Sequence, residues 1–347
     1  MNTLVHPLVS IVTPTYNTAE HLAECIESVI AQTYQNWEYS ILDNCSSDAS
    51  LKIARQYASR DSRIRVHENE RFLAPIQNHN AALRLISSNS KYCKMVFADD
   101  WIFPECLEKM VAIGEEHPTA GLIGAYCLEG RQVICTGLPY SRNLIDGRAT
   151  CREHLLSKLH LFGSANSLLY RADLVKNKDP FFNEANINAD TEVCFDLLRT
   201  ADFGFVHQVL TFTRLRPGSL NTVSLDIHTD LPAALRILKT YGQNYLTATE
   251  LETLIERQLT ECYQFLGKCI FQRRDRKFWD YHRKQLTELG FGFDRVRLFR
   301  STFGNLFLAA TDPKSSIDKL SKYWTLRCQA RGDRACGDRA TAWPAVK

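Results

Sequence analysis

The stretch Cys93-Lys94-Met95-Val96-Phe97-Ala98-Asp99-Asp100 ends a mostly apolar run with two adjacent carboxylates. The run predicts a buried β-strand from Cys93 to Ala98, because it is short and rich in apolar residues. Open α/β sheets bind their ligands beyond the carboxyl ends of the strands. Carboxylate oxygens are hard ligands that suit Mg²⁺ or Mn²⁺. The stretch therefore predicts a site for metal-assisted chemistry on a phosphorylated substrate.

Strand and helix patterns alternate around this stretch. The apolar periodicity predicts strands at 8–13, 37–43, 64–67 and 93–98, and helices at about 22–30, 48–57 and 75–86, with a further helix opened by Pro104. From Gly121 to Thr136 the pattern returns to strand, with a turn at Gly130. This order predicts an α/β fold in which a mostly parallel sheet is covered by helices on both faces.

The composition excludes several classes of protein. The chain of 347 residues has a net charge of +3 and a pI near 8.2, which is far from the balance of a dedicated nucleic-acid binder. Its 12 cysteines form no CxxC pair and no zinc-ligand spacing, which favours a reduced, cytoplasmic location. The sequence contains neither a signal-peptide pattern nor a run approaching the roughly 20 apolar residues of a membrane-spanning helix.

Long helical periodicity begins near residues 225–230. Thr249 and Glu252 have the spacing of a capping box. An apolar stripe follows the same helical pattern: Leu251, Leu254, Ile255, Leu259, Cys262, Leu266, Cys269 and Ile270. We predict a catalytic domain at 1–225 with halves at about 1–120 and 121–225, a helical extension at 226–326 and a disordered tail at 327–347.

The last predicted helix has two interpretations. Val296, Phe299, Phe303, Leu306 and Phe307 share one helical face, and several arginines lie close to them in the sequence. Such a helix could rest on an anionic membrane. Alternatively, it packs on the catalytic domain and leaves a basic face in solvent. The sequence leaves both interpretations open.

Four segments of the first half carry short motifs, and the order of these motifs along the chain is informative. They are Val9-Ser10-Ile11-Val12-Thr13-Pro14-Thr15-Tyr16-Asn17, Ile41-Leu42-Asp43-Asn44-Cys45-Ser46-Ser47-Asp48, Asn69 to Asn80, and Phe97-Ala98-Asp99-Asp100. Together they resemble the family 2 glycosyltransferases of bacterial surface-polysaccharide synthesis, over roughly residues 7–220. The resemblance implies a Rossmann-like GT-A fold with a C-terminal helical extension.

The first two segments resemble the parts of the family that bind the nucleotide. The resemblance implies that the loop with Pro14 and Tyr16 lies along the base. It also implies that Asp43 accepts a hydrogen bond from the base, as an ionised carboxylate can. Asn44 and Cys45 stand where the family usually has Asp and Gly. The alternative is that Asp43 to Asp48 only ends a strand and caps a helix.

The third and fourth segments resemble the phosphate and metal sites. A helix start near Pro75 could hold phosphate oxygens, and Asn78 or Asn80 could add side-chain donors. His79 is expected to be a surface residue of that helix. By the resemblance, Asp100 coordinates Mn²⁺ or Mg²⁺ and Asp99 contacts the ribose or a metal-bound water. Here Ala74 and Phe97 replace a Gly and the first Asp of the family pattern, and the alternative is a pair of solvated acids.

Two later segments resemble the acceptor side of the family. Gly163 to Arg171 is similar to its strand and turn, and Asn188-Ala189-Asp190-Thr191-Glu192 is similar to its Glu-Asp catalytic segment, with Ala189 in place of the Glu. The resemblance implies that Asp190 is the catalytic base; the alternative is a helix N-cap. Arg216, in the loop that begins at Arg214, could bind the diphosphate.

These residues predict a metal-dependent, inverting transfer of a sugar from a nucleotide-diphosphate sugar to an acceptor hydroxyl. The acceptor would be a glycan or a lipid-linked glycan in cell-surface polysaccharide or lipopolysaccharide synthesis. Two alternatives remain open. One is a non-catalytic scaffold of the same fold, favoured by the departures at Cys45, Ala74, Phe97 and Ala189. The other is a nucleotidyltransferase, although the sequence has no evident Gly-rich nucleotide loop near its N-terminus.

Overall fold

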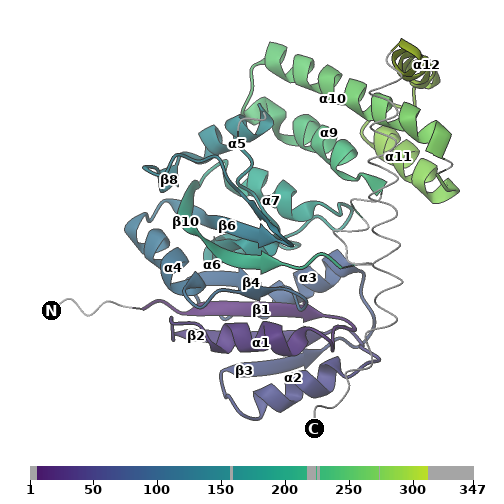
Figure 1. Cartoon of the computed structure of the whole chain (residues 1–347). Coiled ribbons are helices and arrows are strands. Elements are labelled where there is room, and N and C mark those ends of the chain that lie inside the picture. The colour runs from purple at the N-terminus through teal and green to yellow at the C-terminus, as the bar shows by residue number, and fades with distance from the viewer. Residues whose placement is uncertain (1–5, 157–158, 217–223, 225–226, 273, 312–347) are drawn as a thin grey trace, which may run out of the picture. The chain divides into compact units, whose positions relative to one another are not determined.

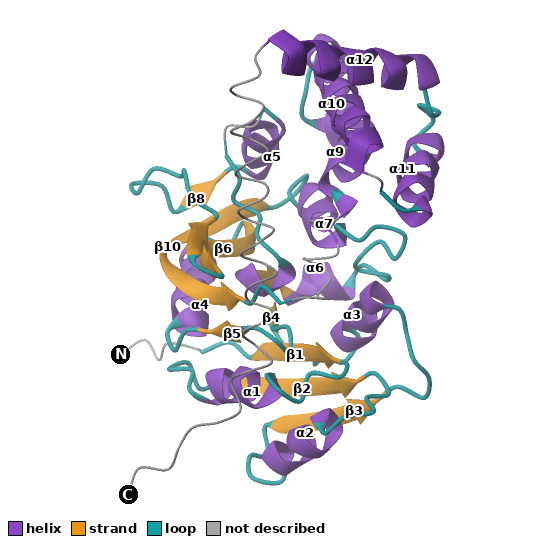
Figure 2. Ribbon diagram, turned by 45° about the vertical axis from the view of Figure 1, so that its right-hand side comes forward, coloured by secondary structure: helices purple, strands orange, loops and turns teal. Residues whose placement is uncertain are grey.

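The N-terminal half of the sheet is parallel. The computed structural model describes residues 6–156, 159–216, 224, 227–272 and 274–311. Strands β1 (Val9–Thr15), β2 (Trp37–Asp43), β3 (Ile64–Glu68) and β4 (Tyr92–Met95) pair in the order β3-β2-β1-β4. They alternate with α1 (Leu22–Ile30), α2 (Ser50–Ala58) and α3 (Pro75–Leu83). The predicted alternation is therefore confirmed, and Figure 2 shows β1, β2 and β3 side by side.

The other half of the sheet is mixed. β9 (Leu168–Arg171) is antiparallel to both β4 and β6 (Ala120–Glu129), whereas β10 (Asp202–Thr213) is parallel to β6. Three short antiparallel strands are added: β5 (Trp101–Ile102) and β8 (Leu144–Ile145) on β10, and β7 (Gln132–Ile134) on β6. Gly130 has a φ of +57° in the β6–β7 turn, a conformation that glycine adopts without strain. The predicted turn is confirmed.

The two acids lie in a turn, a short distance beyond β4. β4 ends at Met95, although the predicted strand ran to Ala98; Val96 still donates a 3.0 Å hydrogen bond to the carbonyl of Val12. The N–H of Asp100 then bonds to the carbonyl of Phe97 at 2.9 Å and closes a turn before β5. Helix α4 (Cys106–Glu116) begins two residues after Pro104, so the helix start predicted at Pro104 was early.

Helices cover both faces of the sheet (Figure 1). Residues of α1, α2 and α4 pack in one buried cluster with Val9, Ile11 and Ile41. Residues of α3, α5 (Gly147–Leu155), α6 (Ala172–Lys176) and α7 (Ala189–Leu197) pack in a second cluster with Val12 and Leu42. Neighbouring strand residues belong to different clusters because side chains alternate across a sheet. The predicted fold class is therefore confirmed.

Helices dominate the rest of the described chain: α9 (Asp230–Tyr241), α10 (Ala248–Cys269), α11 (Arg276–Glu288) and α12 (Arg295–Thr311). None of the helices in the described ranges combines the length and the apolar character that crossing a bilayer requires. The chain divides into two compact units, residues 1–256 and 257–347, so the division falls within α10. The domain ranges predicted from the sequence stay predictions, and the predicted tail at 327–347 lies outside the described residues.

Thr247 and Glu250 form the capping pair at the start of α10. The N–H of Glu250 bonds to the Thr247 hydroxyl at 3.3 Å, and the N–H of Thr247 bonds to the Glu250 carboxylate at 2.9 Å. The sequence assigned this pair to Thr249 and Glu252, which have the same spacing two residues later. That assignment was wrong, because Thr249 already lies inside the helix.

Candidate active site

A cavity of about 510 Å³ in the first unit brings together most of the predicted site residues. Those that line it are Pro14, Tyr16, Asn78, Asp99, Asp100, Asp190 and Arg216. Asp43 and Asn80 lie outside the lining. The lining comes from the carboxyl end of β1, the turn after β4, the start of α3, the start of α7 and the segment after β10. This arrangement follows from the parallel strands, which direct their carboxyl ends to one edge of the sheet.

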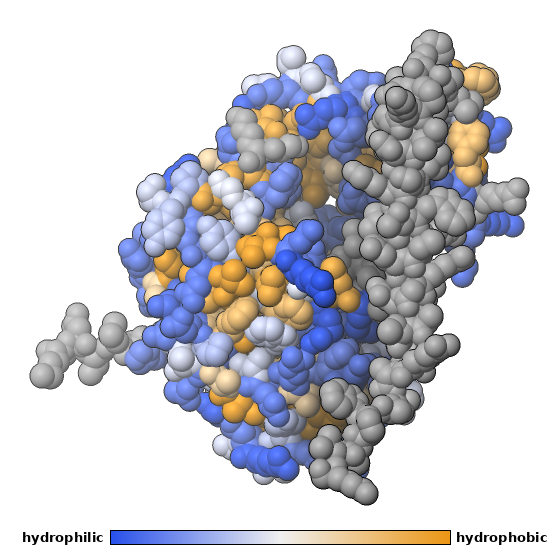
Figure 3. Space-filling view, in the orientation of Figure 1, coloured by the Kyte–Doolittle hydropathy of each residue, from blue (hydrophilic) through white to orange (hydrophobic). Residues whose placement is uncertain are grey.

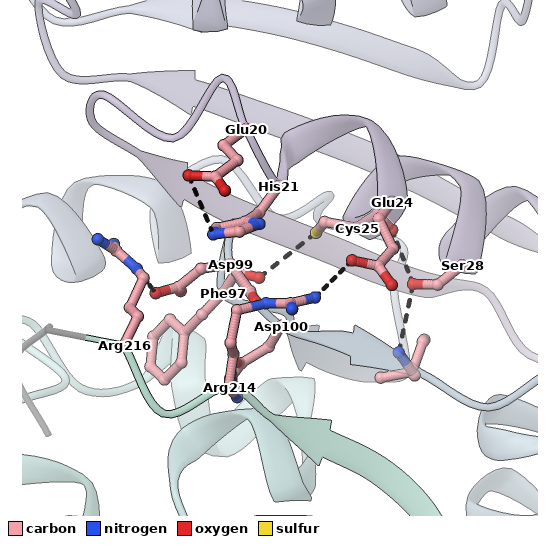
Figure 4. Close-up of polar contacts among 11 residues, drawn as sticks. Glu20, His21, Glu24, Cys25, Ser28, Phe97, Asp99, Asp100, Arg214 and Arg216 are labelled. Atoms are coloured by element: carbon pink, nitrogen blue, oxygen red, sulfur yellow. Dashed lines mark hydrogen bonds and ion pairs between the residues drawn. The ribbon is translucent and has the colours of Figure 1, made fainter. Parts of the chain in front are cut away.

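Asp99 and Asp100 are both held by the segment that follows β10 (Figure 4). Nε of Arg216 donates a 2.5 Å hydrogen bond to Oδ2 of Asp99, and the backbone N–H of Arg214 donates one of 2.8 Å to Oδ1 of Asp100. Asp100 is 3% exposed. Burial, and then the charge of Asp99, raises the pKa of Asp100 well above its usual range. The ionised form of Asp100 therefore lacks sufficient compensation from the protein alone.

This pair of acids fits a hard divalent cation. A positive charge would offset both the burial of Asp100 and its repulsion from Asp99. Among the described residues, no group of three or more His, Cys, Asp or Glu side chains could hold a metal ion. Mg²⁺ is commonly bound through one or two carboxylates, with substrate phosphates and water completing its shell. The chain thus supplies part of such a shell and leaves the remainder to a phosphorylated ligand.

Asp190 is the second residue of α7 and lines the same cavity. Its Oδ1 accepts a 2.8 Å hydrogen bond from the N–H of Thr191, and burial raises the pKa of Asp190 to about 6. The helix N-cap is Asn188, so the alternative interpretation of Asp190 as the N-cap is wrong. A carboxylate with this pKa is largely ionised at neutral pH and is still basic enough to accept a proton.

Two exposed aromatic rings stand at the cavity beside the β1 loop. Tyr16 is 45% exposed and Phe72 is 54% exposed, and their ring centroids lie 4.8 Å apart at an interplanar angle of 62°. Both residues line the cavity. Large exposed aromatic surfaces are suited to stacking against a flat ligand. The sequence predicted Tyr16 at this position but not Phe72.

A polar network supports this part of the cavity. Nδ2 of Asn69 donates hydrogen bonds to Oδ1 of Asn44 at 2.8 Å and to Oδ1 of Asn78 at 2.9 Å. Asn44 and Asn78 both line the cavity. Nearby, Oδ2 of Asp43 accepts the N–H of Ser46 at 2.9 Å, while its buried Oδ1 has no hydrogen-bond partner among the described residues. The free oxygen of Asp43 is compatible with the acceptor role that the sequence predicts.

Asn80 connects two segments of the fold and does not reach the cavity. Its Nδ2 donates to the carbonyl of Phe182 at 2.9 Å and to Glu184 at 3.2 Å, and its Oδ1 accepts the N–H of Phe182 at 2.8 Å. The side chain is 2% exposed. Because these bonds use both ends of the amide, Asn80 has a structural role here, in contrast to the predicted phosphate contact.

His79 is a site residue that the sequence did not predict. It lines the cavity, and its ring centroid lies 5.0 Å from that of Phe97 and 6.3 Å from that of Phe182. Burial lowers the pKa of His79 to about 4, so the imidazole is neutral at neutral pH. The expected surface position was wrong. The spacing of Ile76, His79 and Leu83 at i, i+3 and i+7 was the available signal for an inward-facing position.

Comparisons with known proteins agree with this geometry. Residues 10–168 match the family described as glycosyl transferase family 2. EpsE of Bacillus subtilis is 39% identical over 121 residues, which cover 34% of this chain and 42% of EpsE. The glycosyltransferase GlyG of Streptococcus pneumoniae is 32% identical over 119 residues, which cover 34% of this chain and 39% of GlyG. The matched region thus spans less than half of the length of these relatives.

Two solved structures share the fold at low sequence identity. Staphylococcus aureus TarS 1–349 in complex with UDP-GlcNAc has a TM-score of 0.62 at 15% identity, covering 89% of this chain and 92% of that one. The mannosyltransferase PcManGT from Pyrobaculum calidifontis, in complex with GDP-Man and Mn²⁺, has a TM-score of 0.53 at 13% identity, covering 89% and 87%. These similarities establish the arrangement of the elements.

Proposed function

We propose that this protein transfers a sugar from a nucleoside-diphosphate sugar to an acceptor hydroxyl, because residues 10–168 match the family described as glycosyl transferase family 2. TarS binds UDP-GlcNAc and PcManGT binds GDP-Man with Mn²⁺, which supports a nucleotide-sugar donor and a divalent ion for this chain. The observation that carries the proposal is that Asp190 and the Asp99–Asp100 pair line one cavity. A proton acceptor beside two acids that could hold a cation would support sugar transfer, in which one group takes up the acceptor proton and another neutralises the departing diphosphate.

Asp190 is the proposed general base. As the acceptor oxygen attacks the anomeric carbon, its proton passes to the Asp190 carboxylate. The new carbon–oxygen bond forms while the bond to the diphosphate oxygen breaks, and the electron pair of that bond leaves with the nucleoside diphosphate. A single displacement of this kind inverts the configuration at the anomeric carbon. The pKa of about 6 for Asp190 is close to that of an effective base at neutral pH.

The remaining residues are proposed to bind the donor. Tyr16 and Phe72 offer aromatic surface to the base, and Pro14 lines the same cavity. Asp43 lies outside the lining, so its buried Oδ1 would accept a hydrogen bond from the base only after the surrounding loop opens. The diphosphate would be held by Asn78 and Arg216, which both line the cavity. Asp100 and Asp99 would hold Mn²⁺ or Mg²⁺, which when bound would neutralise charge on the departing diphosphate.

We place this reaction in the cytoplasm, in the synthesis of a surface polysaccharide or lipopolysaccharide, with a glycan or lipid-linked glycan as the acceptor. The cavity of about 510 Å³ falls within the range of roughly 300 to 1,000 Å³ that is common for small-molecule sites. Ser164 and Ala165 line it together with Asp190, and they come from the segment that the sequence assigns to the acceptor side.

The test is release of nucleoside diphosphate from a panel of UDP-, GDP- and dTDP-sugars with Mn²⁺. Slow release by water can reveal the donor when the acceptor is unknown. We expect release with one donor, dependent on metal and at least about a hundredfold slower in Asp190→Asn and Asp100→Asn. Asp173→Asn, an exposed acid on α6, is the matched control and should behave as wild type.

The same assay separates the alternatives. Release of pyrophosphate in place of nucleoside diphosphate would identify a nucleotidyltransferase. A chain that releases neither product, and that calorimetry shows to bind no nucleotide with or without Mn²⁺, would be the non-catalytic scaffold, and the proposal would be rejected.

A further inference from the structure

The charge of the chain is divided unevenly between its two units. Residues 1–256 contain 23 Lys and Arg against 30 Asp and Glu, a net charge of −7. Residues 257–347 contain 19 Lys and Arg against 9 Asp and Glu, a net charge of +10. The net charge of +3 for the whole chain hides this contrast. A strongly basic segment attached to an acidic domain indicates a polyanionic partner for that segment.

Helix α12 of the second unit presents an apolar face to solvent. Val296, Phe299 and Phe303 are 60%, 62% and 53% exposed, and they follow the i, i+3, i+7 spacing of one helical face. The rings of Phe299 and Phe303 lie 4.3 Å apart, so they form continuous aromatic surface. Figure 3 shows hydrophobic surface at the upper right-hand edge of the molecule, next to the atoms drawn in grey. Adjacent exposed phenylalanines are unusual on a protein surface that contacts only water.

The start of the same helix is anchored to its own unit through other residues. The N–H of Asp294 donates a 2.6 Å hydrogen bond to the hydroxyl of Tyr263, and the N–H of Arg297 donates one of 2.9 Å to Oδ1 of Asp294. Thr302 is 8% exposed, so the helix also has a buried side. Helix α12 is therefore packed within its own unit, and its phenylalanines are exposed although the helix is held in place.

Cationic side chains flank the apolar face. Arg295 and Arg300 are exposed, and no acidic side chain pairs with either of them among the described residues. Lys277 at the start of α11 is likewise exposed and without an acidic partner in the described part of the chain. A helix with aromatic residues on one face and arginines beside them is typical of helices that lie in the interface of an anionic membrane.

We propose that α12 docks the protein on an anionic lipid surface, with Val296, Phe299 and Phe303 entering the headgroup region and Arg295 and Arg300 contacting lipid phosphates. The positive charge of the second unit favours an anionic bilayer as the partner of α12. A bilayer offers apolar surface to the exposed phenylalanines and phosphate groups to the arginines. A nucleic acid would satisfy only the charge, and a second copy of this basic surface would be repelled. This inference does not depend on the catalytic activity.

The test is co-sedimentation of the full chain with lipid vesicles. We would compare phosphatidylcholine vesicles with vesicles that contain about one third phosphatidylglycerol, at low salt and at about 0.5 M NaCl. We expect binding only to the anionic vesicles, weakened at high salt. Phe299→Ser with Phe303→Ser, and separately Arg295→Glu with Arg300→Glu, should each reduce the partition coefficient about tenfold or more. Phe299→Leu with Phe303→Leu should retain binding.

Tyr140→Ser is the matched control, because Tyr140 is an aromatic residue of the first unit that is 83% exposed. It should bind vesicles as wild type does. Equal binding of wild type and both double variants, or no binding by wild type, would overturn the proposal. A concentration-dependent dimer that the Phe299→Ser, Phe303→Ser variant abolishes would show that a second copy covers this face. Nucleoside diphosphate release measured without lipid reports on the catalytic proposal separately.

Discussion

Nε of Arg216 lies 2.5 Å from Oδ2 of Asp99, so two residues that are 117 positions apart form an ion pair at the cavity. Their side chains are 33% and 17% exposed, which leaves the pair partly shielded from water. Asp99 is thereby compensated by a side-chain charge, whereas Asp100 receives the backbone N–H of Arg214. Ionisation of Asp100 therefore remains unfavourable, as its raised pKa indicates. Asp100 is also the residue expected to hold the cation.

Asp100→Asn should stabilise the metal-free protein and remove its response to metal. Because burial raises the folded-state pKa of Asp100 above its unfolded value, the folded state loses stability as the pH rises from about 4 through that raised pKa. Asparagine keeps an oxygen for the N–H of Arg214 and carries no charge. We expect the melting temperature without metal to rise by about 2 to 4 °C, corresponding to about 1 kcal/mol. A lower melting temperature would contradict this account.

Asp190→Asn should remove catalysis and leave donor binding intact. The amide has nearly the shape of the carboxylate, but it cannot accept the acceptor proton. General-base catalysis contributes roughly 10²- to 10⁴-fold, so we expect kcat to fall by that factor. The dissociation constant for the nucleotide should change less than about twofold. Weakened nucleotide binding with unchanged kcat would instead place Asp190 in the donor site.

The pH dependence of the rate should report Asp190 directly. The base acts only when it is deprotonated, so the rate should be constant at neutral pH and fall about tenfold per pH unit below a pKa of about 6. The residual rate of Asp190→Asn should lack this inflection. Initial rates between about pH 4.5 and 8.5 at saturating donor would show it. An inflection that persists in the variant would assign it to another group.

Asn78→Ala and Asn80→Ala form a matched pair. The first should mainly weaken nucleotide binding, and the second should mainly lower the stability of the fold. Asn80 forms two buried hydrogen bonds with Phe182 and one partly buried hydrogen bond with Glu184, so its loss should lower the free energy of unfolding by about 2 to 3 kcal/mol. Asn78 lines the cavity, and its loss should chiefly weaken nucleotide diphosphate binding, by about fivefold. Urea denaturation and calorimetry measure the two effects. Equal stability of both variants would refute the structural role of Asn80.

His79→Phe should preserve the fold and weaken donor binding. A phenyl ring can keep the packing against Phe97 and Phe182, but it cannot form hydrogen bonds in the cavity. The loss of one hydrogen bond of about 1 kcal/mol predicts a roughly fivefold weaker affinity for the nucleotide sugar. Calorimetry with the intact donor and with its nucleoside diphosphate would locate the contact. If only the intact donor binds more weakly, His79 contacts the sugar.

Local patterns were sufficient for the elements of the fold. The alternation of Leu8 to Thr13, Leu22 to Ile30 and Trp37 to Asp43 is set by side-chain periodicity, which acts over a few residues and is visible in the sequence. The boundaries were less well determined. Pro104 and Thr249 have the correct chemistry for a helix start, yet α4 and α10 begin elsewhere, because tertiary contacts decide among local signals of similar strength.

The sequence by itself determined the α/β class and the position of Asp99 and Asp100 beyond a buried strand, since both follow from residues close together in the chain. Only the tertiary structure decided that Asp190 and Arg216 share a cavity with Asp99 and Asp100, and that His79 lines it too. It also decided that the side chain of Asn80 is hydrogen-bonded to Phe182. Asn80 and Phe182 are 102 positions apart. Contacts over such separations arise when the sheet and helices pack, and no local periodicity records them.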